Sequence, residues 1–255
     1  MYGREPYVQH EVKKGEEEPE VLRSEIEAAI KKLKSRKAVG VDEIPAEALK
    51  AGRSTVVQAM KNIIDSIWRT GEWPEEWTTS ELVPIPKVPG TQKCTQFRTT
   101  SLISHASKIL LEIIRQRIQY FLTPEIAEEQ FGFMHGKGTT DAILTVRNII
   151  QKTVKKQENE ELWLLFVDYS KAFDSIYHDK LCTTLDESGV PLHLTWLLKR
   201  LYDQATGVVR VGDQRTQPFP FQKGVRQGCL LSPLLFNIFG ERIMRKVQHC
   251  LTEKI

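Results

Sequence analysis

Residues 162–181 read LWLLFVDYSKAFDSIYHDKL. An apolar run in this stretch ends at Asp168, and an aromatic residue and a second acid follow at Phe173 and Asp174. A carboxylate at the end of a buried strand is costly unless a cation meets it there. We therefore expect a strand over 162–168 that delivers Asp168 to a cation.

The composition is ordinary for a globular protein. The 255 residues are 40% hydrophobic and 27% charged, which suits one large domain or two small ones. The net charge of +3 is too small to indicate a nucleic-acid partner by itself. We expect the basic runs 31–37 and 115–117 to be solvated helix faces, and contact with phosphates is the alternative.

Location and redox state follow from what the sequence does not contain. No apolar run approaches the roughly 20 residues that a membrane-spanning helix needs, and the charged N-terminus lacks the apolar core of a signal peptide. The four cysteines form no CxxC pair and are expected to be reduced thiols. We therefore expect an intracellular protein of the nucleus or cytoplasm that is neither secreted nor bound to a membrane.

Helical and extended patterns alternate irregularly, which favours an α+β fold. Ser24 and Glu27 have the spacing of a capping box at the start of a first helix. SELVPIPK, residues 80–87, predicts a strand at a sheet edge because of its two prolines. Gly212-Asp213 predicts a hairpin turn. Further helices are expected over residues 46–50, 56–69, 104–122, 139–156, 192–202 and 232–250.

Several blocks of the chain resemble non-LTR (LINE-type) retrotransposon reverse transcriptases. FVDYSKAFDSIYH resembles the F-V-D-x-x-K-A-F-D-x-V-x-H motif of that family, and KGVRQGCLLSPLLF, from Lys223, resembles its G-x-x-Q-G-x-x-L-S-P-x-L-F block. Upstream, KAVGVDEIPAEALK, VPIPKVPG, FRTTSLISHASKILLE and EEQFGFMHGKGTTDAI resemble further family blocks in the same order. The matched blocks extend from about residue 24 to residue 239.

The resemblance implies a right-hand polymerase with fingers and an incomplete palm, and with the thumb absent. Residues 1–21 are expected to be a flexible charged lead-in, residues 22–160 the N-terminal extension and fingers, and residues 161–255 part of the palm. The family's apolar-x-Asp-Asp hairpin is not found after the Gln-Gly block. We therefore expect a polymerase truncated before that motif, and no DNA synthesis by this chain alone.

The resemblance also assigns roles to residues. Asp168 is the implied catalytic metal ligand for Mg²⁺ (or Mn²⁺), because hard cations prefer carboxylate oxygens. Asp174 and His178 are expected to be structural. The implied nucleotide-binding residues are Lys87, Arg98, Tyr169, Phe173, Gln227 and Gly228. The implied template or primer contacts are Arg115, Arg117, Gly136 and Lys137.

The implied partners are an RNA or DNA template-primer and deoxynucleotides, and protein partners are left open. The sequence is also compatible with two other functions. A non-catalytic nucleic-acid-binding remnant of a mobile element would bind template-primer in a salt-dependent way without chemistry. A Mg²⁺-dependent hydrolase that uses Asp168 and Asp174 would turn over nucleotides without a primer.

Overall fold

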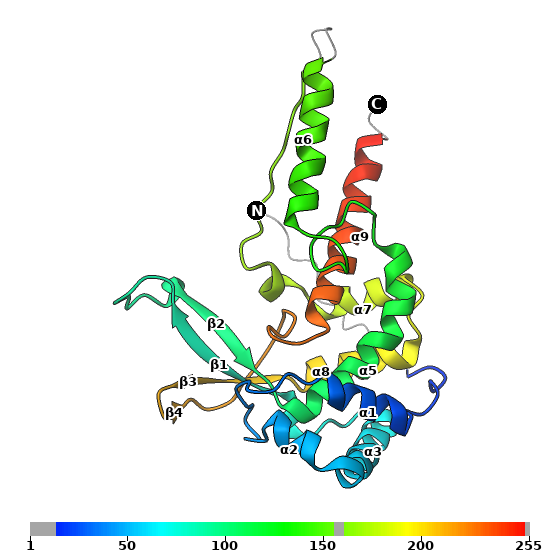
Figure 1. The fold of residues 1–255 in the computed structure, drawn as a ribbon, viewed down its shortest axis with the longest axis vertical. Coiled ribbons are helices and arrows are strands. Elements are labelled where there is room, and N and C mark those ends of the chain that lie inside the picture. The colour runs from blue at the N-terminus through cyan, green and yellow to red at the C-terminus, as the bar shows by residue number, and fades with distance from the viewer. Residues whose placement is uncertain (1–13, 156–160, 253–255) are drawn as a thin grey trace.

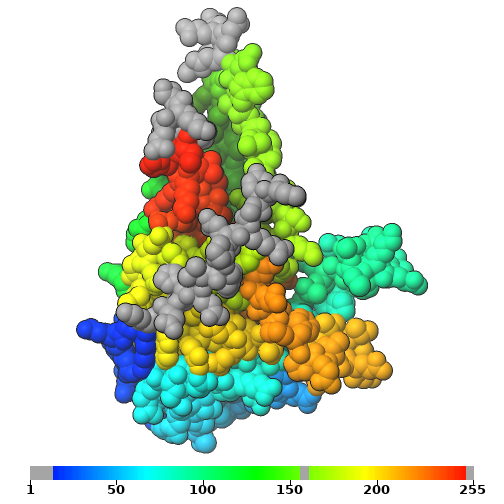
Figure 2. Space-filling model, turned by 180° about the vertical axis from the view of Figure 1, so that it is seen from behind, coloured from blue at the N-terminus to red at the C-terminus, as the bar shows by residue number. Residues whose placement is uncertain are grey.

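The computed structural model describes residues 14–155 and 161–252. Helices α1, α2, α3 and α5 gather at one end, a small sheet projects to one side, and α6 and α9 extend at the other end (Figures 1 and 2). This arrangement is a mixed α+β fold, as predicted. The helices are α1 Arg23–Lys32, α2 Ala46–Ala51, α3 Arg53–Thr70, α4 Glu75–Thr78, α5 His105–Leu122, α6 Thr139–Lys155, α7 His178–Glu187, α8 Leu192–Asp203 and α9 Ser232–Thr252.

Helix α5 is the centre of the core. The hydroxyl of Ser104 accepts from the backbone N–H groups of Ala106 and Ser107, at 3.1 and 3.4 Å, and so caps the first turn. The apolar stripe predicted for residues 104–122 is buried throughout, from Ile109 to Ile118. Helices α1 and α2 pack beside it at the same end of the molecule (Figure 1). The six further helices expected from the sequence are all confirmed.

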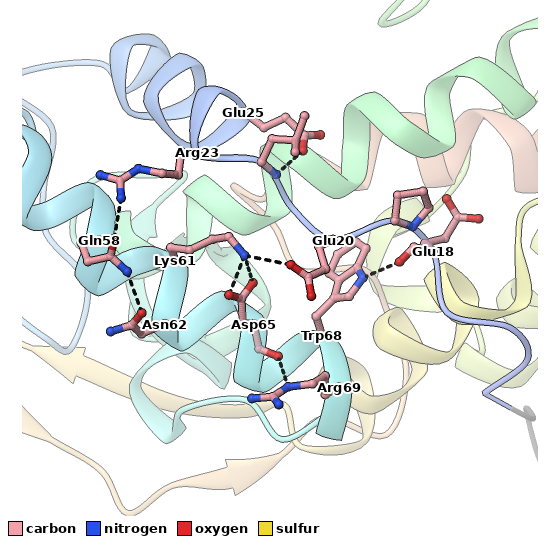
Figure 3. A network of polar contacts seen from close by, with 12 residues as sticks. Glu18, Glu20, Arg23, Glu25, Gln58, Lys61, Asn62, Asp65, Trp68 and Arg69 are labelled. Carbon is pink, nitrogen blue, oxygen red and sulfur yellow. Dashed lines mark hydrogen bonds and ion pairs between the residues drawn. The ribbon is translucent and has the colours of Figure 1, made fainter.

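The first helix begins earlier than the capping-box pattern indicated. Leu22 is the N-cap residue, and its N–H donates to Oε2 of Glu25 at 2.8 Å (Figure 3). Ser24 therefore lies inside the helix, and the predicted cap by Ser24 and Glu27 is wrong. Because Val21 is fully buried, the chain is anchored directly before Leu22, which fixes the start of the helix there.

The sheet has the order β2-β1-β3-β4, with β5 also paired to β3. Strand β1 is antiparallel to β2 and parallel to β3. At Glu81 and Leu82 it has a partner on both sides, so the prediction of an edge strand is wrong there. Pro84 and Pro86, which donate no hydrogen bond, lie in the half that pairs with β2 alone. The strands are β1 Thr79–Pro86, β2 Phe97–Leu102, β3 Thr206–Val211, β4 Gln214–Arg215 and β5 Phe219–Pro220.

The apolar run before Asp168 is not a strand. Residues 161–169 follow an irregular course, and Trp163, Leu165 and Phe166 are 85%, 89% and 80% exposed. A strand needs the N–H and C=O groups of a neighbour along its edge. Within the part of the chain that the structure describes, no strand runs beside this segment. The prediction of a buried strand over 162–168 is therefore wrong for this structure.

Residues 14–21, the described part of the expected flexible lead-in, lie against α3 and α8. The indole N–H of Trp68 donates to the carbonyl of Glu18, and Lys61 pairs with Glu20 (Figure 3). The N–H of Glu18 donates to Nδ1 of His193 at 3.1 Å. The segment thus has fixed contacts with both helices. The rest of the lead-in lies outside the described residues.

No helix in the described ranges is both long enough and apolar enough to cross a bilayer. The predicted nuclear or cytoplasmic location stays a prediction.

Candidate nucleotide site

The Gln-Gly block forms a loop that is fixed to the segment after Asp168. The N–H of Gly224 donates to the carbonyl of Ile176 at 2.7 Å, and the N–H of Val225 donates to that of Phe173 at 2.8 Å. Gly224 has a φ of +96°, and a Cβ there would lie 2.9 Å from the Cα of Asp174. Because side chains rarely adopt this conformation and no space remains, the position requires glycine.

The same loop also meets the sheet. Gly228 has a φ of +79°, and a Cβ there would lie 2.8 Å from the carbonyl oxygen of Ser101 on β2. Phe173, Gln227 and Gly228, three of the residues predicted to bind nucleotide, therefore lie in two segments that are joined to each other and touch β2. No local pattern in the sequence indicated the intermediate contact through Gly224.

Arg226 anchors this loop and was not anticipated from the sequence. Its side chain is buried and donates to Oγ of Ser80 at 3.1 Å and to the carbonyl of Trp77 at 2.9 Å. Burial lowers the pKa of Arg226 below its ordinary value, although a guanidinium stays protonated near neutrality. The burial of a charged residue in a polar loop has no signature in the sequence, because its cause is the distant α4–β1 junction.

A cavity of about 190 Å³ opens where the loop, β1, β2 and the segment after Phe173 meet. Lys223 and Arg226 contribute two positive charges to its lining, and Asp174 contributes one carboxylate. The amide of Gln227 donates to Oδ1 of Asp174 at 2.7 Å, which orients the glutamine. The excess of cations suits an anionic ligand. Asp174 therefore braces the loop, as predicted, and it also lines the cavity.

His178 is a scaffold residue, as predicted. It is buried, its Nε2 lies 2.9 Å from the carbonyl oxygen of Gly224, and its ring stacks on Tyr202 with centroids 4.6 Å apart. Since a carbonyl only accepts, Nε2 carries the proton. Burial lowers the pKa of His178, so the neutral ring is favoured.

Phe173 packs within an aromatic group beside the cavity. Its ring stacks on Phe236 of α9 at a centroid distance of 4.8 Å and meets Phe133 edge-on at 5.9 Å. The ring is half-buried. The structure thus explains why an aromatic residue packs here, whereas its predicted place beneath a sugar stays a prediction.

Asp168 and Tyr169 do not join this group. Both lie on the exposed 161–169 segment, and neither lines the cavity. Across the described residues, no three His, Cys, Asp or Glu side chains gather to hold a metal ion. A lone carboxylate does not provide the several oxygen ligands that Mg²⁺ uses. The described residues therefore do not fit a complete metal centre.

The two predicted cations of the fingers lie on the β1–β2 hairpin. Lys87 directly follows β1, and its N–H donates to the carbonyl of Gln96. Arg98 is exposed on β2, next to Thr99, which lines the cavity. Since neighbouring side chains of a strand point to opposite faces, Arg98 lies on the face away from the cavity. Neither predicted nucleotide contact is part of the cavity wall.

The four predicted template contacts have different surroundings. Arg115 forms two hydrogen bonds with the carboxylate of Glu112, at 2.7 and 2.9 Å, and these raise the pKa of Arg115. Arg117 pairs with Glu25 at 2.9 Å and lies over the Trp68 ring. Both arginines are thus engaged inside the protein, and their template contacts stay predictions. The ammonium of Lys137 bonds a carbonyl and lies over Phe131, and the neighbouring Gly136 has open space around it.

Comparison with known proteins agrees with the resemblance in the sequence. A family described as reverse transcriptase (RNA-dependent DNA polymerase) matches residues 85–255, about two thirds of the chain. The chain belongs to this family. Its members depend in general on divalent metal ions, although the described part of this reverse transcriptase chain holds no complete metal centre.

Relatives from mobile elements match most of this chain. It is 29% identical to an RNA-directed DNA polymerase from mobile element jockey of Drosophila funebris, over 86% of the chain and 24% of that protein. It is 26% identical to an uncharacterized 149 kDa protein of transposon TX1 of Xenopus laevis, over 97% of the chain and 19% of that protein. It is 25% identical to a Pol polyprotein of retrotransposable element R2 of Popillia japonica, over 89% of the chain and 31% of that protein. The chain thus spans under a third of each.

Proposed function

We propose that this chain forms the fingers and the first part of the palm of an RNA-directed DNA polymerase from a non-LTR retrotransposon. Residues 22–160 would be the N-terminal extension and fingers, and residues 161–255 the palm portion. The observation that carries the proposal is the meeting of β2, the Phe173–Asp174 segment and the Gln227–Gly228 loop around one cavity. Three family blocks far apart in the sequence converge there. The names of the relatives from mobile elements agree with this function.

The cavity is proposed to hold part of the incoming deoxynucleotide, and an RNA or DNA template-primer is proposed to lie beside it. Lys223 and Arg226 supply positive charge for a triphosphate, and such charge is worth more in a partly buried site than in water. Gln227, held by Asp174, would contact the nucleotide. Gly228 keeps the loop close to β2. Lys87 on the hairpin and Tyr169 on the exposed segment are proposed to approach the nucleotide when it is bound. Arg98 lies on the other face of β2, so its proposed contact with the nucleotide requires a movement of the hairpin.

Asp168 is proposed as a ligand for Mg²⁺ (or Mn²⁺), the ion that would stabilise the attacking and leaving oxygens of phosphoryl transfer. The described residues provide no cluster of carboxylates with which it would share the ion. Alignment of the reactants supplies most of the catalysis in this chemistry. We therefore expect the 255-residue chain to bind template-primer and nucleotide without extending the primer.

The test measures both binding and chemistry. We expect a labelled RNA–DNA template-primer to bind with an affinity that falls as salt rises, and a deoxynucleoside triphosphate to strengthen that binding. Gln227→Ala and Lys223→Glu should abolish the strengthening by nucleotide. Lys152→Glu on α6 is the matched exposed control for the charge reversal and should retain it.

The alternative functions predict different outcomes of these assays. Template-primer binding that nucleotide does not strengthen would favour the binding remnant, and nucleotide hydrolysis without a primer would favour the hydrolase. Metal-dependent primer extension by the 255-residue chain would support the polymerase and refute its expected inactivity. Absence of nucleic-acid binding would overturn the proposal.

A further inference from the structure

Helices α1, α2 and α3 enclose a groove with a volume of about 490 Å³. Its floor is made of Ile30, Leu49 and Val57, which are 7%, 7% and 4% exposed. The volume lies within the range of about 300–1,000 Å³ that is typical of ligand pockets. These side chains are nearly buried, so the floor offers their outer edges as concave aliphatic surface to a ligand.

The rim of this groove is basic. Lys31, Lys50 and Arg53 contribute three positive charges, and Glu27 contributes the one carboxylate among the lining residues. Lys50 donates to the hydroxyl of Ser35 at 3.2 Å, and its charge also attracts the carboxylate of Glu47, three residues earlier on α2. None of the three cations forms an ion pair with another residue in the described ranges. The rim thus carries an excess of positive charge beside an apolar floor.

Two neighbouring cations of the same helices have carboxylate partners. Lys32 pairs with Glu112 at 2.9 Å, although it directly follows Lys31. Lys61, further along α3, pairs with Asp65 at 2.5 Å (Figure 3). The three cations at the groove form no such ion pair among the described residues, so they are available to an anionic partner.

We propose that this groove binds an acidic amphipathic helix of a partner protein. The apolar residues on one face of such a helix would cover Ile30, Leu49 and Val57, and its carboxylates would meet the basic rim. A helix that lays its apolar face into a groove is a recurrent mode of peptide recognition. The charge of the rim selects acidic over basic helices, because unlike charges attract across the interface and like charges repel.

The chemistry of the floor favours a peptide over nucleic acid. Phosphates would meet the rim equally well, but single-stranded nucleic acid is held largely by stacking of its bases on aromatic rings. No lining residue of the groove is aromatic. The groove and the candidate nucleotide cavity share no lining residue, so both sites can be occupied together.

The experiment measures binding of a fluorescein-labelled helical peptide to the whole 255-residue chain by fluorescence anisotropy. The peptide has about 16 residues, long enough for a helix, with leucines along one face and glutamates on both sides. Probes of comparable length are the peptide with lysine in place of glutamate, a sequence-scrambled isomer and a single-stranded RNA. We expect the acidic amphipathic peptide to bind at least about tenfold more tightly than either other peptide.

Variants locate the site. Lys31→Glu with Arg53→Glu should weaken binding about tenfold or more, since two attractions become repulsions. The matched control is Lys152→Glu with Lys155→Glu, an equal change of charge on exposed residues of α6, and it should leave binding unchanged. Val57→Phe should weaken binding by filling the floor, and its unfolding temperature is measured to verify that it folds.

Three results would overturn the proposal. The first is equal binding of the three peptides, and the second is loss of binding in the α6 control but not in the rim variant. The third is binding of the RNA, weakened about tenfold or more by the rim variant, together with no binding of the acidic peptide. The groove would then be a phosphate-binding surface.

Discussion

Replacement of Gly224 by alanine tests the packing that builds the cavity. The added Cβ would lie 2.9 Å from the Cα of Asp174 and 3.2 Å from its carbonyl carbon and oxygen. These are backbone atoms, and hydrogen bonds on both sides of Gly224 hold the two segments together. The loop thus has little freedom to move away. A left-handed conformation costs an L-residue about 1–2 kcal/mol, and overpacking adds about 1–3 kcal/mol.

Gly136→Ala is the matched control. Gly136 has a φ of +75°, but nothing lies within 4 Å of its added Cβ. Both variants share the conformational cost and the entropy that alanine removes from the unfolded chain, so the difference between them isolates the clash. We expect Gly224→Ala to lower the free energy of unfolding by about 1–3 kcal/mol more than Gly136→Ala. Urea denaturation followed by tryptophan fluorescence measures this difference, and equal losses at the two positions would refute the packing at Gly224.

Two further predictions concern stability and association. Nδ1 of His193 accepts from the backbone N–H of Glu18, so Nε2 carries the proton and donates to the carbonyl of Trp68. Burial lowers the pKa of His193, and Lys14 lowers it further, although the nearby Glu17 and Glu18 act in the opposite direction. The neutral ring of His193 therefore stabilises the fold above the ordinary histidine pKa of about 6.5, and this stabilisation is lost as the pH falls below that pKa. His193→Gln should reduce the decline in unfolding free energy between pH 7 and pH 5. An unchanged dependence of the unfolding free energy on pH would contradict this. Leu165 and Phe166 are 89% and 80% exposed, and exposed apolar surface promotes association between molecules. Lysine at both positions should therefore lower the mean mass measured by sedimentation. An unchanged mass would show that this segment does not cause association.

Local patterns predicted the helices well because each helix satisfies its own backbone groups. The apolar spacing in 104–122 was enough to predict α5, and the hydroxyl of Ser104 caps its first turn. The first helix shows the limit of this reasoning, since burial of Val21 moved its start ahead of Ser24. Where packing outside an element competes with a local pattern, the sequence alone does not rank the two.

Pairing between distant segments was the part that the sequence predicted least well. Strand β1 pairs with β3, more than a hundred residues later, and nothing within 80–87 indicates that neighbour. The site shows the same division. Gln227 and Phe173 were found from their own motifs, but Arg226 draws its three acceptors from Trp77, Thr79 and Ser80, so its anchoring role depends on the tertiary fold.

The course of residues 161–169 follows from the same physics. Their apolar character predicted a strand, but a strand is a property of a pair of segments, because its N–H and C=O groups must be satisfied by a neighbour. Within the described residues this run has no such neighbour, and its side chains remain exposed. Asp168 is carried on that run, so its position relative to the Gln227 cavity depends on whatever pairs with the run. Formation of a metal centre at Asp168 and burial of Leu165 and Phe166 should therefore occur together, since both require the same partner.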